Sequence, residues 1–462
     1  MSKLKVSAIH DPDNDNEAIT VDTSGNVTFS RNATFSGTVS GIDTGAKTIS
    51  DDDTATYNDG DYFYSPTGVV YRKLNDGTSS AWYSLADGTK QTNEALSVET
   101  SFAAGYSHSA YINSDGELYV AGNNASGELG LGDTTDRTSW TKVDIDNVEK
   151  VFITYASTFV IKTDGTVWAT GYNYGGNLGL GDTTYRNEFT QVNITNVSKI
   201  SGGEHTIILK TDGSLWTCGY NGMGALGNGT TTNTSTFAQI VSSGVVDIWG
   251  SMYSSYYIDS SGAVYSCGWN HIGQLGIGNT TDRSSFGTTG ITSGASKFPS
   301  GFSYYDTAVL KSDGSLWGCG ANTKGQLNNG NTTNQSSFIQ SYSSGVEQVT
   351  VGNQSYSILK TDGSVYSIGD NAVGQLGNGN TTDQSSYYEN FASGSNVAYI
   401  LRGASYFLII EDDNTISGLG LNSDGQLALG DTTDRTSFVD TGITDAVSED
   451  QSAGNKTIAE LA

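Results

Sequence analysis

Short runs of alternating apolar and polar residues flank an Asp-Gly turn, or a close relative of it, at seven points in the chain. One example is KTDGTVWATG, and the second turn residues of the seven copies are Gly116, Gly165, Gly213, Gly262, Gly314, Gly363 and Asn414. Alternation predicts half-buried strands, and turn residues that accept a positive φ predict a hairpin between them. The spacing of about 50 residues is typical of propeller blades and solenoids. The pattern therefore predicts seven copies of one β-rich unit.

Each copy divides into four strands. In the second copy these are VEKVFI, STFVIKT, TVWATG and EFTQVNI, with the Asp-Gly hairpin between the second and the third. Four antiparallel strands make one propeller blade, and a closed ring of seven blades removes the exposed sheet edges that an open solenoid would keep. We therefore expect an all-β fold in which residues 94–462 form a seven-bladed β-propeller of four-stranded blades.

A loop rich in turn-forming residues joins the third and fourth strands of every copy. It reads NASGELGLGDTTDRTS in the first copy, and all seven contain the pattern N-x-x-G-x-L. A purely superficial loop would not need the same apolar residue each time. We therefore expect the leucine to be buried between neighbouring blades, where it contributes about 1.5–3 kcal/mol. The asparagine is expected to hydrogen-bond the backbone of its own loop. This N-x-x-G-x-L loop is called the clasp below.

The pattern G-x-N-x-x-G-x-L-G-x-G after D-G-x-[LV]-[WY] resembles the repeat of the regulator of chromosome condensation family over roughly residues 94–443. The resemblance implies a seven-bladed propeller, and kelch repeats, which share the period, lack this loop. Members of that family differ in activity, from nucleotide exchange to β-lactamase inhibition and other protein binding, so the fold does not fix the function. The last segment, ITDAVSEDQSAGNKTIAELA, resembles the first half of another copy and either supplies a closing strand or packs elsewhere.

The first 93 residues follow a different pattern. EAITVDTSGNVTFSRNATFSGTVSG is similar to N-terminal segments of bacteriophage tail fibres, and NDGDYFYSPTGVVYRKLNDGTSSAWYSLADG resembles a small β module found in such fibres. Strands this short bury little core within one chain, so interdigitation of identical chains, for example three, would complete the core. We expect residues 1–50 to be a β-rich segment for virion anchoring and oligomerisation, and residues 51–93 to be a small β module and linker.

Charge and composition exclude several classes of partner. The formal net charge is −27, which would repel the phosphates of a nucleic acid and an anionic membrane surface. No apolar run approaches the roughly 20 residues needed to span a bilayer, so we expect no membrane insertion. The start, MSKLKVSAIHDPDND, has no apolar signal-peptide region. A phage protein needs none, because it assembles in the host cytoplasm and leaves by lysis.

The predicted topology gathers the variable loops on one face. In an antiparallel blade, the loops after the first strand and after the third strand share a face, and the Asp-Gly hairpins lie on the other. Tyr and Trp combine apolar area with a polar tip, which suits stacking on sugars or anchoring on a protein. The alternative is that these rings pack against adjacent blades. The predicted receptor-binding residues are Tyr106, Tyr155, Tyr172, Tyr174, Tyr220, Met252, Tyr253, Trp269, Tyr304 and Tyr305.

We expect no cofactor. DPDND places Asp11, Asp13 and Asp15 as in the opening of a calcium loop. Asn16 stands where that loop needs glycine, however, and a solvated acidic turn is the alternative to a calcium site.

We also expect no enzymatic activity. His108 and His205 share a repeat position that holds Ser, Asp or Tyr in the other copies, which favours a structural hydrogen bond in the loop. Glu204 beside His205 would make an acid–base pair, but no nucleophile accompanies it.

The sequence thus favours a bacteriophage virion protein, a tail fibre or other appendage. Its N-terminus would bind other virion proteins, and its propeller would bind a glycan or protein on the host surface as part of a homo-oligomer. One alternative is a capsid or tail decoration protein that docks without binding a receptor. Another is a soluble protein-binding propeller that acts as an inhibitor or exchange factor. The sequence does not name the receptor, the host or the number of subunits.

Overall fold

The protein is described here from a computed structural model. The structure describes residues 101–113 and 115–443 in full and, before them, the backbone of the short strands β1 to β8. The chain divides into two units, which are described separately, and the propeller lies within Leu96–Gln451. The suggested calcium loop and residues 444–462 lie outside the described residues.

The described strands of the other unit form three small groups. Two are strand pairs, and the third is a four-stranded antiparallel sheet in the order β5-β6-β7-β8. The pairs are formed by β1 (Ile9–His10) with β4 (Thr34–Phe35), and by β2 (Ile19–Val21) with β3 (Val27–Phe29). The sheet consists of β5 (Tyr62–Tyr64), β6 (Val70–Asn75), β7 (Ser80–Ser84) and β8 (Lys90–Gln91).

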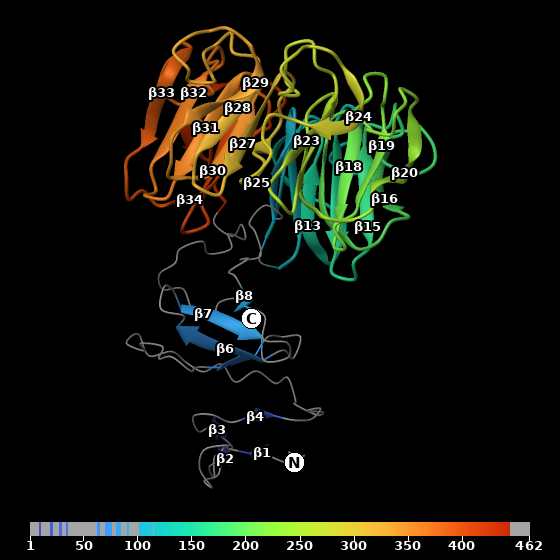
Figure 1. Ribbon diagram of the computed structural model, residues 1–462, viewed down its shortest axis with the longest axis vertical. Coiled ribbons are helices and arrows are strands. Elements are labelled where there is room, and N and C mark those ends of the chain that lie inside the picture. The colour runs from blue at the N-terminus through green and yellow to red at the C-terminus, as the bar shows by residue number, and fades with distance from the viewer. Residues whose placement is uncertain are drawn as a thin grey trace. The chain divides into compact units, whose positions relative to one another are not determined.

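The described residues of the larger unit form seven sheets, each built mainly from the antiparallel strands of one sequence copy (Figure 1). Blade one consists of β9 (Phe102–Ala104), β10 (His108–Ile112), β11 (Leu118–Gly122) and β12 (Arg137–Lys142). Blade two consists of β13 (Val148–Ile153), β14 (Ser157–Lys162), β15 (Val167–Gly171) and β16 (Arg186–Val192). Blade three consists of β17 (Val197–Gly202), β18 (His205–Lys210), β19 (Leu215–Gly219) and β20 (Thr234–Val241).

The remaining blades repeat this order. Blade four consists of β21 (Val245–Gly250), β22 (Ser254–Asp259), β23 (Val264–Gly268) and β24 (Arg283–Thr288). Blade five consists of β25 (Ala295–Lys297), β27 (Asp306–Lys311), β28 (Leu316–Gly320) and β29 (Gln335–Tyr342). Blade six consists of β30 (Val346–Gly352), β31 (Ser355–Lys360), β32 (Val365–Gly369) and β33 (Gln384–Phe391). Blade seven consists of β34 (Val397–Arg402), β35 (Tyr406–Glu411), β36 (Ile416–Gly420) and β37 (Arg435–Asp440). The predicted seven-bladed propeller is confirmed.

Blade five departs from the common pattern at its first strand. Pro299 follows β25 closely, and because proline has no backbone N–H, it cannot donate to a sheet. The chain resumes as β26 (Ser300–Gly301), which pairs in parallel with β30 of blade six and gives that sheet a fifth strand.

The hairpins and clasps adopt the predicted local structure. The turn residues Gly165 and Asn414 have φ of 79° and 68°, the left-handed conformation that an Asp-Gly or Asp-Asn hairpin requires. The seven clasp leucines are at most 1% exposed, and they are Leu129, Leu178, Leu226, Leu275, Leu327, Leu376 and Leu427. Leu129 packs with Val148 and Val160 of blade two. The leucine is therefore buried between neighbouring blades, as predicted.

Each clasp is held by its asparagine. The side-chain oxygen of Asn124 accepts the backbone N–H of Leu129 at 2.9 Å, and the same bond recurs at 2.9 Å in all seven copies. The amide of Asn124 donates to the carbonyls of Asp133 and Thr135, which fixes the return of the loop. All seven asparagines are fully buried, so these bonds satisfy groups that water does not reach.

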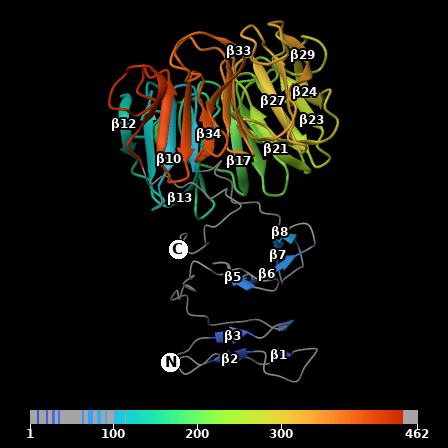
Figure 2. The same ribbon diagram turned by 90° about the vertical axis from the view of Figure 1, so that its left-hand side faces the viewer.

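The same clasp closes the ring. A side chain at Gly425 of blade seven would meet the backbone of Thr138 in blade one at 2.6 Å, so only glycine fits this approach. The Gly430 N–H donates to the Thr138 carbonyl at 2.7 Å, and the Tyr406 hydroxyl donates to the His108 carbonyl at 2.6 Å. β34 of the last blade contacts β9 of the first, and Figure 2 shows the orange-red strands of the last blade next to the teal strands of the first. Each blade draws its strands from within residues 102–440, so no strand exchange is needed for closure.

A buried polar row lies at the start of the second strands. His108 and His205 are at most 1% exposed, and their Nε2 atoms lie 3.0 Å from Thr158 Oγ1 and 2.6 Å from Ser255 Oγ. Both partners belong to the next blade, so the structural hydrogen bond that we predicted within the loop connects two blades instead. Burial lowers the pKa of His108 to about 3 and that of His205 to about 4, and both rings are neutral.

Replacing a clasp leucine should loosen the contact between two blades. For Leu275→Ala we expect the free energy of unfolding to fall by about 2–5 kcal/mol, because a fully buried side chain leaves a cavity. The measurement is urea unfolding followed by tryptophan fluorescence. The half-exposed Val246→Ala should change stability by less than about 0.5 kcal/mol. Equal effects of the two changes would contradict the role of the clasp.

Asp306, which occupies the same position as the two histidines, should make stability depend on pH. It is 1% exposed, and burial raises the pKa of its carboxyl to about 7. The folded protein therefore holds a proton that the unfolded chain has lost between about pH 4 and 7, so stability falls as pH rises, by at most about 1.4 kcal/mol per unit. Asp306→Asn should remove this slope. Thermal melts of both proteins at pH 5 and pH 8 test it, and parallel pH profiles would contradict it.

Candidate functional site

Aromatic side chains from the first loops converge near the axis of the propeller. The ring centroids of Tyr106 in blade one and Tyr155 in blade two lie 5.1 Å apart. Tyr304 of blade five approaches the same rings, with its centroid 5.9 Å from that of Tyr106. Met252 and Phe302 form the buried base of this cluster. Blades that are distant in sequence therefore present their first loops on a common side.

The third loops extend this cluster outward in both directions. The ring centroid of Tyr155 lies 6.2 Å from that of Tyr172 in blade two. On the other side, Tyr304 contacts Tyr305 at 5.4 Å, and Tyr305 contacts Trp269 of blade four at 5.8 Å. Further contacts join Tyr172 to Tyr174, Trp269 to Tyr253, and Tyr253 to Tyr220. All nine aromatic residues that the sequence selected thus belong to one connected set of rings, which we call the aromatic face.

Exposure differs widely across the aromatic face. Tyr174 is 67% exposed, whereas Met252 is 2% exposed and lies under the rings. Met252 therefore supports the surface and does not reach a partner, which is a correction to its selection as a contact residue. The other eight rings are partly buried, because each packs on its neighbours and keeps one side open. These rings pack against their neighbours and are also partly open to a partner, although from the sequence alone packing and binding are alternatives.

Glu204 places a carboxylate among these rings. The Tyr253 hydroxyl donates to Glu204 Oε1 at 3.4 Å. Partial burial raises the pKa of Glu204, and burial followed by the charge of Glu204 raises the pKa of Tyr172 and Tyr253, the latter to about 12. The phenols are consequently protonated and can donate hydrogen bonds. His205 bonds to Ser255 and not to Glu204, so these two residues do not form the acid–base pair that the sequence suggested.

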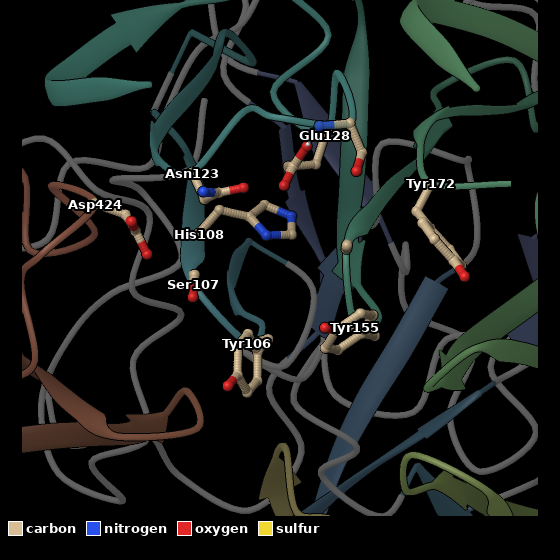
Figure 3. A pocket seen from close by; sticks show the side chains of 10 residues that line it. Tyr106, Ser107, His108, Asn123, Glu128, Tyr155, Tyr172 and Asp424 are labelled. Carbon is tan, nitrogen blue, oxygen red and sulfur yellow. Dashed lines mark hydrogen bonds between the residues drawn. The ribbon is translucent and has the colours of Figure 1, made fainter. Parts of the chain in front are cut away.

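A pocket of about 330 Å³ opens beside the aromatic face at the junction of blades seven, one and two. Tyr106, Tyr155 and Tyr172 form one side of it. Figure 3 shows the carboxylate of Glu128 and the ring of His108 directed toward its middle, with Asp424 on the side opposite Tyr172. Burial raises the pKa of both Glu128 and Asp424. The pocket thus combines two acidic side chains with three tyrosine rings.

In the described part of the chain there is no group of side chains suited to a metal ion and no helix suited to crossing a membrane. Among residues 101–113 and 115–443, no three His, Cys, Asp or Glu side chains are grouped so that they could hold a metal ion. Within the same residues, no helix has the length and apolar character needed to cross a bilayer.

Sequence reasoning missed three residues at this site. Tyr185 is 44% exposed and its ring centroid lies 5.1 Å from that of Tyr172. It occupies a clasp position that holds Asp or Asn in the other six copies, so an aligned comparison of the copies would have revealed it. The same comparison exposes Glu128 and Asp424. Each is the only acid at its position among the seven copies.

Comparison with known protein families supports the repeat. Two models described as "Regulator of chromosome condensation (RCC1) repeat" match this chain, one over residues 100–128 and 195–225 and the other over residues 362–388. A search of curated protein sequences gives no match.

Solved structures show the same fold at low sequence identity. Human WBSCR16 is 20% identical with a TM-score of 0.63, over 71% of this chain and 94% of that one. Yeast RCC1 (Prp20), solved bound to Kap60, is 14% identical with a TM-score of 0.63, over 76% and 87% of the two chains. Prp20p of Saccharomyces cerevisiae, whose structure was reported with its binding properties to Gsp1p and histones, is 15% identical with a TM-score of 0.61, over 71% and 86%. The chain therefore carries regulator of chromosome condensation repeats that fold into a seven-bladed propeller.

Proposed function

We propose that this protein is a binding protein without catalytic activity, and that its propeller docks a protein partner through the aromatic face. The observation that carries the proposal is the continuity of the face, in which rings from blades one to five contact one another from Tyr174 to Tyr220. Tyr and Trp dominate binding energy at protein interfaces because they bury a large area at a small cost in side-chain entropy.

Two further observations support docking over catalysis. The rings of His108 and His205 are neutral and bonded to the neighbouring blade, so they are poorly placed to move protons. The similar yeast propeller was solved with a protein, Kap60, and its binding to Gsp1p and histones was described. Protein binding is therefore an established use of this fold. For this chain, fold similarity at this identity supports protein binding by analogy alone.

A second candidate function places the docking propeller in a bacteriophage virion, as a tail fibre or a decoration protein. The phrases in residues 1–93 that resemble tail fibres favour this setting. In a fibre, the aromatic face would bind a host glycan or surface protein, since tyrosine and tryptophan rings also stack on sugars. In a decoration protein, it would bind another virion component. Gold labelling of the propeller on purified particles separates distal fibre tips from the shell, and particles without label would remove both forms of this candidate.

Changing the aromatic face should abolish docking without unfolding the propeller. For Tyr174→Ala combined with Trp269→Ala, we expect partner affinity to fall by at least about 100-fold, since each aromatic hot-spot residue contributes about 2 kcal/mol or more. Immobilised protein is exposed to a cell lysate and, for the bacteriophage candidate, to intact bacterial cells, and bound proteins and cells are quantified by mass spectrometry and cell counting.

The matched control is Tyr388→Ala. Tyr388 is also exposed, at 39%, but lies in β33, the outer strand of blade six. It should leave binding unchanged, and all variants should keep the thermal midpoint of the parent. Species retained equally by the double variant, the control and the parent would show that docking uses another surface.

A further inference from the structure

The pocket beside the aromatic face is acidic at two positions where the other blades are not. Glu128 precedes the clasp leucine of blade one, and its equivalents are Asn177, Ala225, Gln274, Gln326, Gln375 and Gln426. Asp424 precedes the clasp glycine of blade seven, and its equivalents are Ser126, Gly175, Met223, Ile272, Lys324 and Val373. Both acids line the same pocket although they come from blades at opposite ends of the sequence.

The fold does not need the charge of Glu128. Its Oε2 accepts the backbone N–H of Ser126 at 2.7 Å. The four equivalent glutamines accept the same backbone bond through Oε1 at 2.9 to 3.2 Å. A neutral amide therefore completes the clasp, whereas a carboxylate that is only 2% exposed carries a desolvation cost. A charge that costs stability and is not required by the loop points to a ligand.

The junction of blades five and six shows how such a site is neutralised. Lys324 of blade five occupies the position equivalent to Asp424, and its Nζ lies 2.6 Å from Asp383 Oδ2 and 3.0 Å from Asp370 Oδ1. Asp383 and its equivalent in blade one, Asp136, each accept the backbone N–H of their clasp asparagine, at 2.9 Å and 2.8 Å. At this junction the chain supplies its own ammonium group from the preceding blade.

The junction of blades seven and one has the acids and lacks the cation. Within the described residues, no ion pair is formed by Glu128, Asp136 or Asp424. The ring of His108, which also lines the pocket, is buried and uncharged. Burial raises the pKa of Glu128, and the negative charges of Asp136 and Asp424 act in the same direction.

The three tyrosine rings that line the pocket indicate which kind of cation fits. The rings of Tyr106, Tyr155 and Tyr172 offer aromatic faces and apolar edges, which attract an organic cation and its aliphatic stem. A volume of about 330 Å³ exceeds the need of a single metal ion, and the described residues hold no group of three or more ligands for one.

The geometry points to a binding pocket for an arginine or lysine side chain of the docked protein, with its charge against Glu128 and Asp424 and its stem against the three tyrosine rings. Asp136 adds its negative charge beside these two acids. The inference rests on the proposed docking function and names the chemistry of the partner residue that enters the pocket.

The test uses blocked, fluorescein-labelled peptides with one central arginine, or one central citrulline of nearly the same shape without the charge. Fluorescence anisotropy on the full chain at low ionic strength should show binding of the arginine peptide and at least about tenfold weaker binding of the citrulline peptide. Glu128→Gln should weaken the arginine peptide by a similar factor, because it removes the charge and keeps the backbone bond seen in four other blades. Its thermal midpoint should equal or exceed that of the parent.

Glu188→Gln is the matched control, since it makes the same change in net charge at an exposed residue outside the pocket. It should leave the affinity for the arginine peptide unchanged. Equal affinity for the arginine and citrulline peptides, or unchanged affinity in both Glu128→Gln and Asp424→Asn, would overturn the pocket. Because this measurement uses no natural partner, it fails or succeeds independently of the Tyr174 and Trp269 experiment.

Discussion

The structure depends on the burial of one leucine at each junction between blades. A single four-stranded blade has two apolar faces and cannot cover them by itself, so its stability comes from the neighbouring blades. The clasp makes this contact specific, because Leu129 and its equivalents lie in the core between two sheets. The clasp asparagine accepts a hydrogen bond from the buried backbone N–H of the leucine. Apolar burial supplies the free energy, and the asparagine makes that burial possible.

The loops differ from blade to blade although the junctions between blades repeat. The positions that maintain the junctions are repeated in all seven blades, whereas the positions that face outward from the first and third loops differ from blade to blade. Tyrosine and tryptophan occupy them in blades one to five and form one surface, and acids occupy two clasp positions only where blade seven meets blade one. A clasp can carry such substitutions because its fold requires only the asparagine, the glycine and the leucine.

Buried polar groups mark the same junctions. Arg402 is fully buried in blade seven, where its guanidinium donates to the hydroxyls of Ser355 and Ser357 in blade six and lies 4.5 Å from the ring centre of Phe407. Burial lowers the pKa of this guanidinium to about 9. Such groups must be hydrogen-bonded to be tolerated in the interior, and we expect these bonds to favour one alignment of blades six and seven.

The sequence by itself determined the repeat, the hairpins, the clasp and the seven-bladed ring, because each depends on local spacing that recurs seven times. It also selected nine rings that the structure joins, since the alternation of loops between two faces follows from antiparallel order alone. Only the tertiary structure placed Met252 beneath those rings, directed His108 to Thr158 of the next blade, and brought Glu128 and Asp424 into one pocket. The physical reason is that these contacts join different blades, and ring closure makes neighbours of residues about 300 positions apart.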